Sequence, residues 1–314
     1  MTGGFMGLMT GIDLGGTKTE VVVLDDSGIE LIRRRLPTPQ GDYAATLATV
    51  QRLIDEAESE LGERTSVGIG TPGALSKVTG CLKNSNSACL NGKPLLEDLQ
   101  RLLGRPVRIA NDADCFALSE ATDGAAAGAG IVFGVILGTG VGGGIVVNGA
   151  PLSGPNGIAG EWGHNPLPWP LDEERPGPPC YCGKHGCIET FLSGPGFSNA
   201  HRRLSGQTLE AGKIVDAAEG GDDLCRRSMA IYDDRLARAL AQVINILDPD
   251  VIVLGGGLSN CRRWYETVPR LWGRYVFSDR VDTRLVPPRH GDSSGGRGAA
   301  WLWRREISLA SPRS

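Results

Sequence analysis

The feature that most constrains the fold is a pattern of two short apolar runs joined by a glycine turn, which occurs twice. The first copy is Ile12–Leu14 and Val21–Leu24 around Gly15-Gly16-Thr17. The second copy is Val135–Leu137 and Ile145–Val147 around Gly138-Thr139-Gly140. Short apolar runs that flank glycine predict buried strands joined by a tight turn. Two such units in one chain predict two similar halves.

Helical periodicity separates these strands. Residues 43–61 carry apolar side chains three and four positions apart, with Asp42 before them and Gly62 after them, which predicts a capped amphipathic helix. Residues 229–247 predict a second strong helix, followed by the apolar run Val251–Leu254. Strands that alternate with helices indicate an α/β chain with a largely parallel or mixed sheet.

Length and charge exclude several classes of protein. The 314 residues are enough for two domains, and 32 basic against 36 acidic residues give a net charge of −4. Without a long basic run, nucleic acid and anionic membrane are poor partners. No apolar stretch approaches the roughly 18 residues of a membrane span, and the first ten residues lack the charged start of a signal peptide. We therefore expect a cytoplasmic protein.

Glycine makes up 46 of the 314 residues, roughly double its ~7% base rate, and it is clustered. Glycine turns let backbone amides approach phosphate oxygens, and an adjacent acid can hold Mg²⁺ through water. The alternative for each turn is an ordinary glycine hairpin, which the repetition disfavours. The candidate nucleotide-binding residues are Asp13, Gly15, Gly16, Thr17, Lys18, Gly138, Thr139, Gly140, Gly142, Gly143, Gly255, Gly256 and Gly257.

Acidic residues near these turns suggest acid–base chemistry and hydroxyl binding. Asp112 follows a predicted strand and precedes a helix, so it is either a general base for phosphoryl transfer to a hydroxyl or a helix cap. Glu161, His164 and Glu189 are suited to bidentate hydrogen bonding with vicinal hydroxyls. The alternative for both glutamates is a solvated surface position.

A histidine and three cysteines have the types and number of a closed zinc site. His164, Cys180, Cys182 and Cys187 would form a tetrahedral Cys₃His centre. Cysteines buried in the core are the alternative, but the preceding segment, rich in glycine and proline, offers little apolar packing. A site with no open coordination position indicates a structural metal.

Five blocks of the chain, taken in order, resemble the successive signatures of the ROK family of sugar kinases and repressors. These blocks are Gly11–Lys18, Gly68–Gly73, Asn111–Ala113, Glu161–His164 and Cys180–Glu189. The resemblance covers essentially the whole chain. It implies a two-domain actin-like (ribonuclease H-like) α/β fold, MgATP as phosphoryl donor, a structural zinc ion and a homodimer.

The resemblance also implies roles for individual residues. Asp112 would be the catalytic base, the two early glycine loops would hold phosphates, and His164 would both ligate zinc and contact the sugar. The implied substrate-binding residues are Gly73, Asn86, Asn111, Asp112, Glu161, His164 and Glu189. The expected domains are residues 1–115, completed by a C-terminal helix near 296–310, and residues 116–295 with the zinc site.

Three segments within the family pattern resemble the bacterial fructokinase/mannokinase branch. They are Lys83–Ser87, Glu161–Trp169 and Gly291–Trp303. The preferred expectation is transfer of phosphate from ATP to the 6-hydroxyl of fructose, with mannose tolerated. An N-acetylglucosamine kinase or glucokinase of the same family is the alternative. A sugar-responsive repressor is disfavoured, because the residues before Asp13 are too few for a DNA-binding domain.

Overall fold

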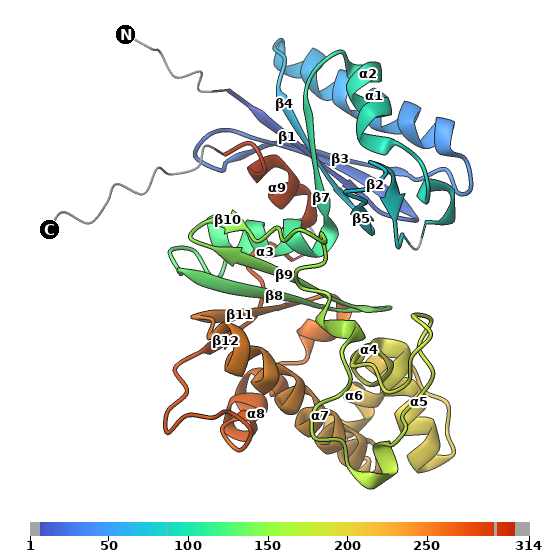
Figure 1. The fold of residues 1–314 in the computed structure, drawn as a ribbon, viewed down its shortest axis with the longest axis vertical. Coiled ribbons are helices and arrows are strands. Elements are labelled where there is room, and N and C mark those ends of the chain that lie inside the picture. Colours follow the sequence, from blue (N-terminus) through green and yellow to red (C-terminus); the bar gives the residue numbers. More distant parts are fainter. Residues whose placement is uncertain (1–6, 86, 292–293, 305–314) are drawn as a thin grey trace, which may run out of the picture. The chain divides into compact units, whose positions relative to one another are not determined.

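The computed structural model describes residues 7–85, 87–291 and 294–304. These residues form two compact units. The first unit comprises Met1–Gly128, Gly144–Ala159 and Asp292–Ser314, and the second comprises Ala129–Gly143 and Gly160–Gly291. Both are mixtures of helices and strands (Figure 1), as the alternating sequence pattern predicts.

The first unit is built on a five-stranded sheet in the order β3-β2-β1-β4-β7. Its strands are β1 (Met9–Leu14), β2 (Lys18–Leu24), β3 (Glu30–Pro37), β4 (Ser66–Thr71) and β7 (Val107–Asn111). β1 is antiparallel to β2 and parallel to β4, so the predicted strand–turn–strand unit is confirmed. A short hairpin of β5 (Ala74–Leu75) and β6 (Leu82–Lys83) and the turn η1 (Ala88–Leu90) follow β4.

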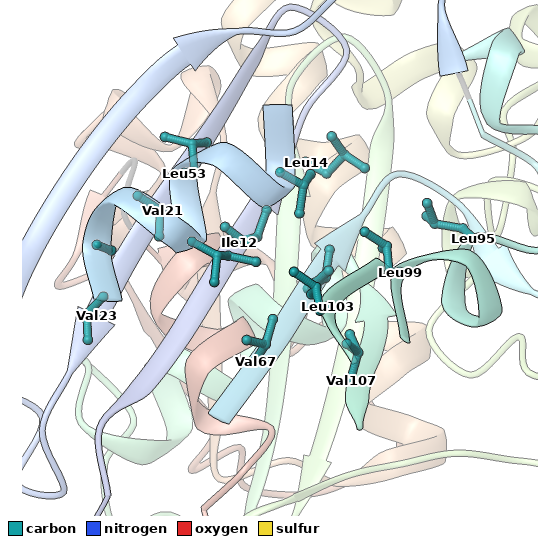
Figure 2. Packing of buried hydrophobic residues seen from close by; sticks show 14 of the residues in the cluster. Ile12, Leu14, Val21, Val23, Leu53, Val67, Leu95, Leu99, Leu103 and Val107 are labelled. Carbon is teal, nitrogen blue, oxygen red and sulfur yellow. The ribbon is translucent and has the colours of Figure 1, made fainter. Parts of the chain in front are cut away.

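One face of this sheet is covered by α1 (Tyr43–Leu61) and α2 (Leu95–Leu103). Figure 2 shows Ile12, Leu14 and Val21 of the sheet packed in the same core as Leu53 and Leu99 of these helices. The predicted caps of α1 are confirmed. Asp42 accepts a hydrogen bond from the amide of Ala45, and Gly62 ends the helix at a φ of 72°.

The other face of the sheet is covered by α3 (Asp112–Thr122) and α9 (Ser294–Trp301). Glycine permits this contact, because a Cβ on Gly11 would lie 1.8 Å from the carbonyl oxygen of Gly296. A Cβ on Gly298 would lie 1.7 Å from the carbonyl oxygen of Cys115. Since α9 packs on both the sheet and α3, the first unit extends to Gly128 rather than ending at residue 115. The expected helix near 296–310 corresponds to α9, and its positions from 305 onward lie outside the described residues.

A second five-stranded sheet has the order β10-β9-β8-β11-β12, and most of it belongs to the second unit. The strands of this sheet are β8 (Ile131–Leu137), β9 (Val141–Val147), β10 (Ala150–Pro151), β11 (Val251–Gly255) and β12 (Arg284–Val286). The helices are α4 (Glu189–Leu192), α5 (Gly194–Ser205), α6 (Ala211–Glu219), α7 (Asp223–Leu247) and α8 (Arg263–Trp272). The predicted helix over 229–247 is thus the C-terminal part of α7, which begins earlier at an Asp222 cap.

The segment between β10 and α4 contains only three-residue turns, η2 (Trp162–His164) and η3 (Asp172–Glu174). A buried ion pair anchors it to α7. The two carboxylate oxygens of Glu174 each accept from Arg238 at 2.9 Å, and Arg238 also donates to the carbonyl oxygen of Trp169 at 2.8 Å. This long loop is therefore held both by a buried ion pair and by backbone hydrogen bonds, among them one from the amide of Leu167 to the carbonyl oxygen of Gly186 at 2.9 Å.

Candidate active site

The first glycine turn closes tightly between β1 and β2. The amide of Gly15 donates to the carbonyl oxygen of Lys18 at 3.0 Å, and a Cβ on Gly15 would lie 2.8 Å from that oxygen. Thr38 braces the turn by donating its hydroxyl to the Gly15 carbonyl at 2.8 Å. Gly16 and Thr17 are exposed, so their backbone is open to an anionic ligand.

Two carboxylates of the first unit lie close enough to influence each other. Burial, together with the negative charges of Asp112 and Glu20, raises the pKa of Asp13 to about 6. The start of α9 is packed against Asp13, since a Cβ on Gly295 would lie 2.8 Å from its carboxylate. A cation beside Asp13 would relieve this repulsion, which makes Asp13 a fitting ligand for Mg²⁺, directly or through water.

Asn111 and Asp112 lie where β7 ends and α3 begins. The side-chain oxygen of Asn111 accepts from the amide of Ala113 at 2.8 Å, so Asn111 is the helix cap. Its side-chain nitrogen donates to the carbonyl oxygen of Gly73 at 3.1 Å. Asp112 also accepts from the Ala113 amide at 2.8 Å through one oxygen. Capping therefore does not require Asp112, and its position at a strand end suits a general base.

Two further positions of the first unit belong to this region. Gly73 has a φ of 87°, and a Cβ there would lie 2.4 Å from the carbonyl oxygen of Lys83, so glycine is required. The predicted sugar ligand Asn86 lies outside the described residues. Its neighbour Ser85 exchanges two hydrogen bonds with Asn91, at 2.9 and 2.8 Å, which fixes the loop on one side of it.

The second glycine turn joins β8 to β9 and contacts Glu189. The amide of Gly138 donates to the carbonyl oxygen of Gly140 at 3.0 Å. One carboxylate oxygen of Glu189 accepts from the amide of Val141 at 3.0 Å. Glu189 is therefore tied to the turn instead of being a solvated surface acid.

The third glycine cluster lies beside the second turn. Gly256 has a φ of 78°, and a Cβ there would lie 2.4 Å from the carbonyl oxygen of Leu137. Gly142 and Gly143 differ from the other candidates, because they lie inside β9. Gly142 accepts a hydrogen bond from the Trp162 indole at 3.0 Å, and Gly143 is packed against the same side chain. Packing against Trp162 therefore accounts for glycine at position 143.

The four predicted metal ligands come together in the second unit. Their ligand atoms all lie within 4.8 Å of one another. The Sγ of Cys182 is 3.6 Å from that of Cys187, and the Sγ of Cys180 is 3.6 Å from Nδ1 of His164. Tetrahedral zinc, with bonds of about 2.3 Å to sulfur and about 2.0 Å to nitrogen, spaces such atoms about 3.6 to 3.8 Å apart. The donor set thus fits zinc, and the thiols face one another rather than an apolar core.

The backbone around this cluster is built from turns. The amide of Cys180 donates to the carbonyl oxygen of Lys184 at 2.8 Å, and Gly183 returns a hydrogen bond to Cys180 at 3.0 Å. A β-bridge between Pro166 and Cys187 joins this loop to the segment that carries His164. Backbone hydrogen bonds therefore position the loop independently of a metal ion.

Tyr181 is a site residue that sequence reasoning missed. Its hydroxyl lies 2.9 Å from Nε2 of His164, and the two rings meet edge to face at 5.0 Å. Desolvation of its hydroxyl group, with the charges of Glu189 and Glu161, raises the pKa of Tyr181 to about 12. The available signal was its place between two ligands of the Cys-x-Cys motif, where the backbone is fixed on both sides.

Comparison with known proteins decides the family. The model of the ROK family matches residues 9–306. This chain belongs to the ROK family. It is 42% identical over 297 residues to the N-acetyl-D-glucosamine kinase of Pectobacterium atrosepticum, covering 93% of this chain and 97% of that protein. It is 41% identical over 296 residues to the enzyme of the same name from Salmonella typhimurium, covering 93% and 98%.

Solved structures agree with this assignment. A ROK hexokinase from Thermus thermophilus superposes with a TM-score of 0.83 at 30% identity, covering 94% of this chain and 97% of that one. A ROK family glucokinase from Streptomyces griseus, solved with glucose and AMPPNP, superposes with a TM-score of 0.76 at 26% identity, covering 94% of this chain and 99% of that one. The expected actin-like two-domain fold is confirmed, and this ROK protein is a sugar kinase. No helix in the described part of the chain has the length and apolar character needed to cross a membrane.

Proposed function

We propose that this protein transfers the γ-phosphoryl group of ATP to the 6-hydroxyl of N-acetylglucosamine. The observation that carries the proposal is the 41–42% identity, over 93% of the chain, to N-acetyl-D-glucosamine kinases. The expectation of fructose depends on three short segments of the sequence. Two of them contain positions outside the described residues, Asn86 in one and residues 292–293 in the other. Similarity along the whole chain outweighs these segments.

Asp112 is the proposed general base. Phosphoryl transfer to a sugar requires a carboxylate within hydrogen-bond reach of the attacking hydroxyl. Asp112 accepts the proton as the sugar oxygen forms its bond to the γ-phosphorus, and the bond from that phosphorus to ADP breaks. Asn111, fixed at both ends of its amide by Ala113 and Gly73, keeps a second N–H for a sugar oxygen.

The phosphates of ATP are proposed to bind at the Gly15–Thr17 turn, through the exposed backbone of Gly16 and Thr17, with Lys18 providing positive charge. In this proposal Asp13 binds Mg²⁺, which neutralises phosphate charge during transfer. The turns Gly138–Gly140 and Gly256–Gly257, in which Thr139, Gly256 and Gly257 are exposed, are the candidate nucleotide-binding turns of the second unit. These assignments are consistent with the glycine geometry of each turn.

Glu161, His164 and Glu189 are proposed to bind the hydroxyl groups of the sugar. Zinc held by His164 and the three cysteines has a structural role, because four protein ligands leave no open position. Zinc bound at this cluster would fix the orientation of the His164 imidazole ring, and the amide of Val141 fixes the carboxylate of Glu189. The expected homodimer remains a prediction.

The test is a coupled ADP-release assay with N-acetylglucosamine, fructose, mannose and glucose. We expect the highest kcat/KM for N-acetylglucosamine, with the new phosphate on the 6-position by NMR. A higher kcat/KM for fructose would overturn the substrate assignment and restore the fructokinase interpretation. ADP release that does not depend on any sugar would overturn the kinase proposal itself.

A further inference from the structure

The Tyr181 side chain combines high exposure with a specific polar contact. It is 80% exposed, yet its hydroxyl lies 2.9 Å from Nε2 of His164. Cys180 and Cys182, on either side of it, both belong to the candidate zinc cluster. The backbone of Tyr181 is therefore held in place, while its ring has little packing to keep it in one rotamer.

The geometry of the cluster fixes which nitrogen of His164 faces the tyrosine. Nδ1 lies 3.6 Å from the Sγ of Cys180, so Nδ1 is the metal ligand. An imidazole that ligates through Nδ1 carries its proton on Nε2. His164 consequently donates Nε2–H to the oxygen of the Tyr181 hydroxyl. The hydroxyl hydrogen of Tyr181 therefore points away from Nε2 of His164.

A sugar hydroxyl has the same hydrogen-bonding capacity as a phenol, one donor and an oxygen acceptor. It would accept from Nε2–H of His164, which is the role that Tyr181 fills here. A sugar that binds His164 must take the place of this hydroxyl. Since the ring is mostly exposed, rotation of Tyr181 into solvent breaks no buried packing.

We propose that Tyr181 is an internal occupant of a sugar-hydroxyl subsite at His164, which bound sugar displaces. The inference rests on the proposed function. A conformer that blocks the site lowers the apparent affinity of every sugar that uses His164 by one common factor. Tyr181 thus sets the sugar concentration at which the kinase is half saturated, without taking part in the chemical step.

The first experiment is isothermal titration of N-acetylglucosamine into wild-type protein and into Tyr181→Phe. The variant keeps the ring and removes the competing hydroxyl. We expect its Kd to be about five-fold lower, the equivalent of one ordinary hydrogen bond, with kcat unchanged. Tyr275→Phe is the matched control, because the Tyr275 hydroxyl also makes one side-chain hydrogen bond in this unit, to Asp234 at 2.7 Å. Its Kd should equal that of wild type.

The second experiment uses the 1-, 3- and 4-deoxy analogues of the same sugar. The analogue that lacks the displacing hydroxyl should bind wild type and Tyr181→Phe with equal Kd, while the others keep the five-fold difference. In ¹⁵N-histidine NMR without sugar, Nε2–H of His164 should exchange faster with water in the variant. Equal or weaker binding of N-acetylglucosamine by Tyr181→Phe would overturn the inference alone. Absence of any sugar binding by wild type would contradict the proposed function as well.

Discussion

Asn111 is hydrogen-bonded to the carbonyl oxygen of Gly73, 3.1 Å away, while its own side-chain oxygen caps α3. This pairing joins the end of β7 to the turn after β4. It leaves one amide hydrogen of Asn111 with a fixed direction beside Asp112. The geometry of the proposed base therefore depends on Gly73, which itself contributes no side chain.

Gly73→Ala should lower both stability and activity. The new Cβ would meet the Lys83 carbonyl at 2.4 Å, so the turn must shift and Asn111 with it. We expect kcat/KM to fall by about ten-fold or more, because catalysis is sensitive to small displacements of positioning groups. Gly80→Ala is the control, since Gly80 also has a positive φ, 70°, but open space around its Cβ position. Equal effects of the two variants on kcat/KM would contradict the positioning role.

Asp112→Asn should abolish most catalysis while preserving the fold. The change is nearly isosteric and removes the proton acceptor, so kcat should fall at least ~10²-fold with sugar affinity within a few-fold. Steady-state kinetics and titration calorimetry on the same preparation separate the two effects. Retention of more than half of the wild-type kcat would exclude Asp112 as the base.

Cys182→Ser should lose zinc and stability together. A structural Cys₃His site contributes its binding free energy to the folded state, so removing one thiolate lowers the melting temperature and the metal content in parallel. Elemental analysis and thermal unfolding of protein purified without chelator provide the measurement. Cys81→Ser, at a half-buried position outside the cluster, is the control. Wild-type protein with no zinc would contradict the prediction.

Glu174 should make stability depend on acidic pH. Burial favours the neutral acid, but hydrogen bonds from Arg238 and Arg235 lower the pKa of Glu174 from 4.5 to about 2. Because the folded pKa lies below the unfolded one, this carboxylate stabilises the fold above about pH 4.5, and the contribution disappears as pH falls towards 2.

Urea unfolding of Glu174→Gln provides the check. The free energy of unfolding of the variant should be well below that of wild type at pH 7, and this difference should shrink steadily as the pH falls from 4.5 to 3. Glu173→Gln changes an exposed neighbour of the same charge and serves as the reference. A deficit that stays constant over this range would show that the ion pair does not cause it.

Local patterns were enough to predict the elements that local chemistry determines. The length of α1 follows from apolar spacing between an aspartate cap and a glycine, and both ends are confirmed. The four residues of the metal cluster could be selected because thiols and imidazole are the usual ligands of structural zinc, and three of the cysteines lie within eight residues of one another. Both cases depend on residue type and short spacing.

Contacts between distant segments were not predictable in the same way. Nothing in the sequence near Val141 indicates that its amide binds Glu189, or that Gly143 is packed against Trp162. Tyr181 was missed because its significance depends on the rotamer that places its hydroxyl on His164. Sugar preference is harder still, since the pocket differences that select among hexoses are worth only about 1 to 3 kcal/mol.

The glycine contacts of α9 also bear on how the chain is synthesised. The sheet face that contains Gly11 is complete once β7 has been made, yet the helix that covers it begins only at Ser294. A ribosome must therefore translate the entire second unit before the first can bury the part of that face that α9 covers. During this interval the nascent sheet presents Gly11, Val22 and Gly68 to the solvent, where chaperones could bind. The earliest part of the polypeptide is thus among the last to reach its native packing.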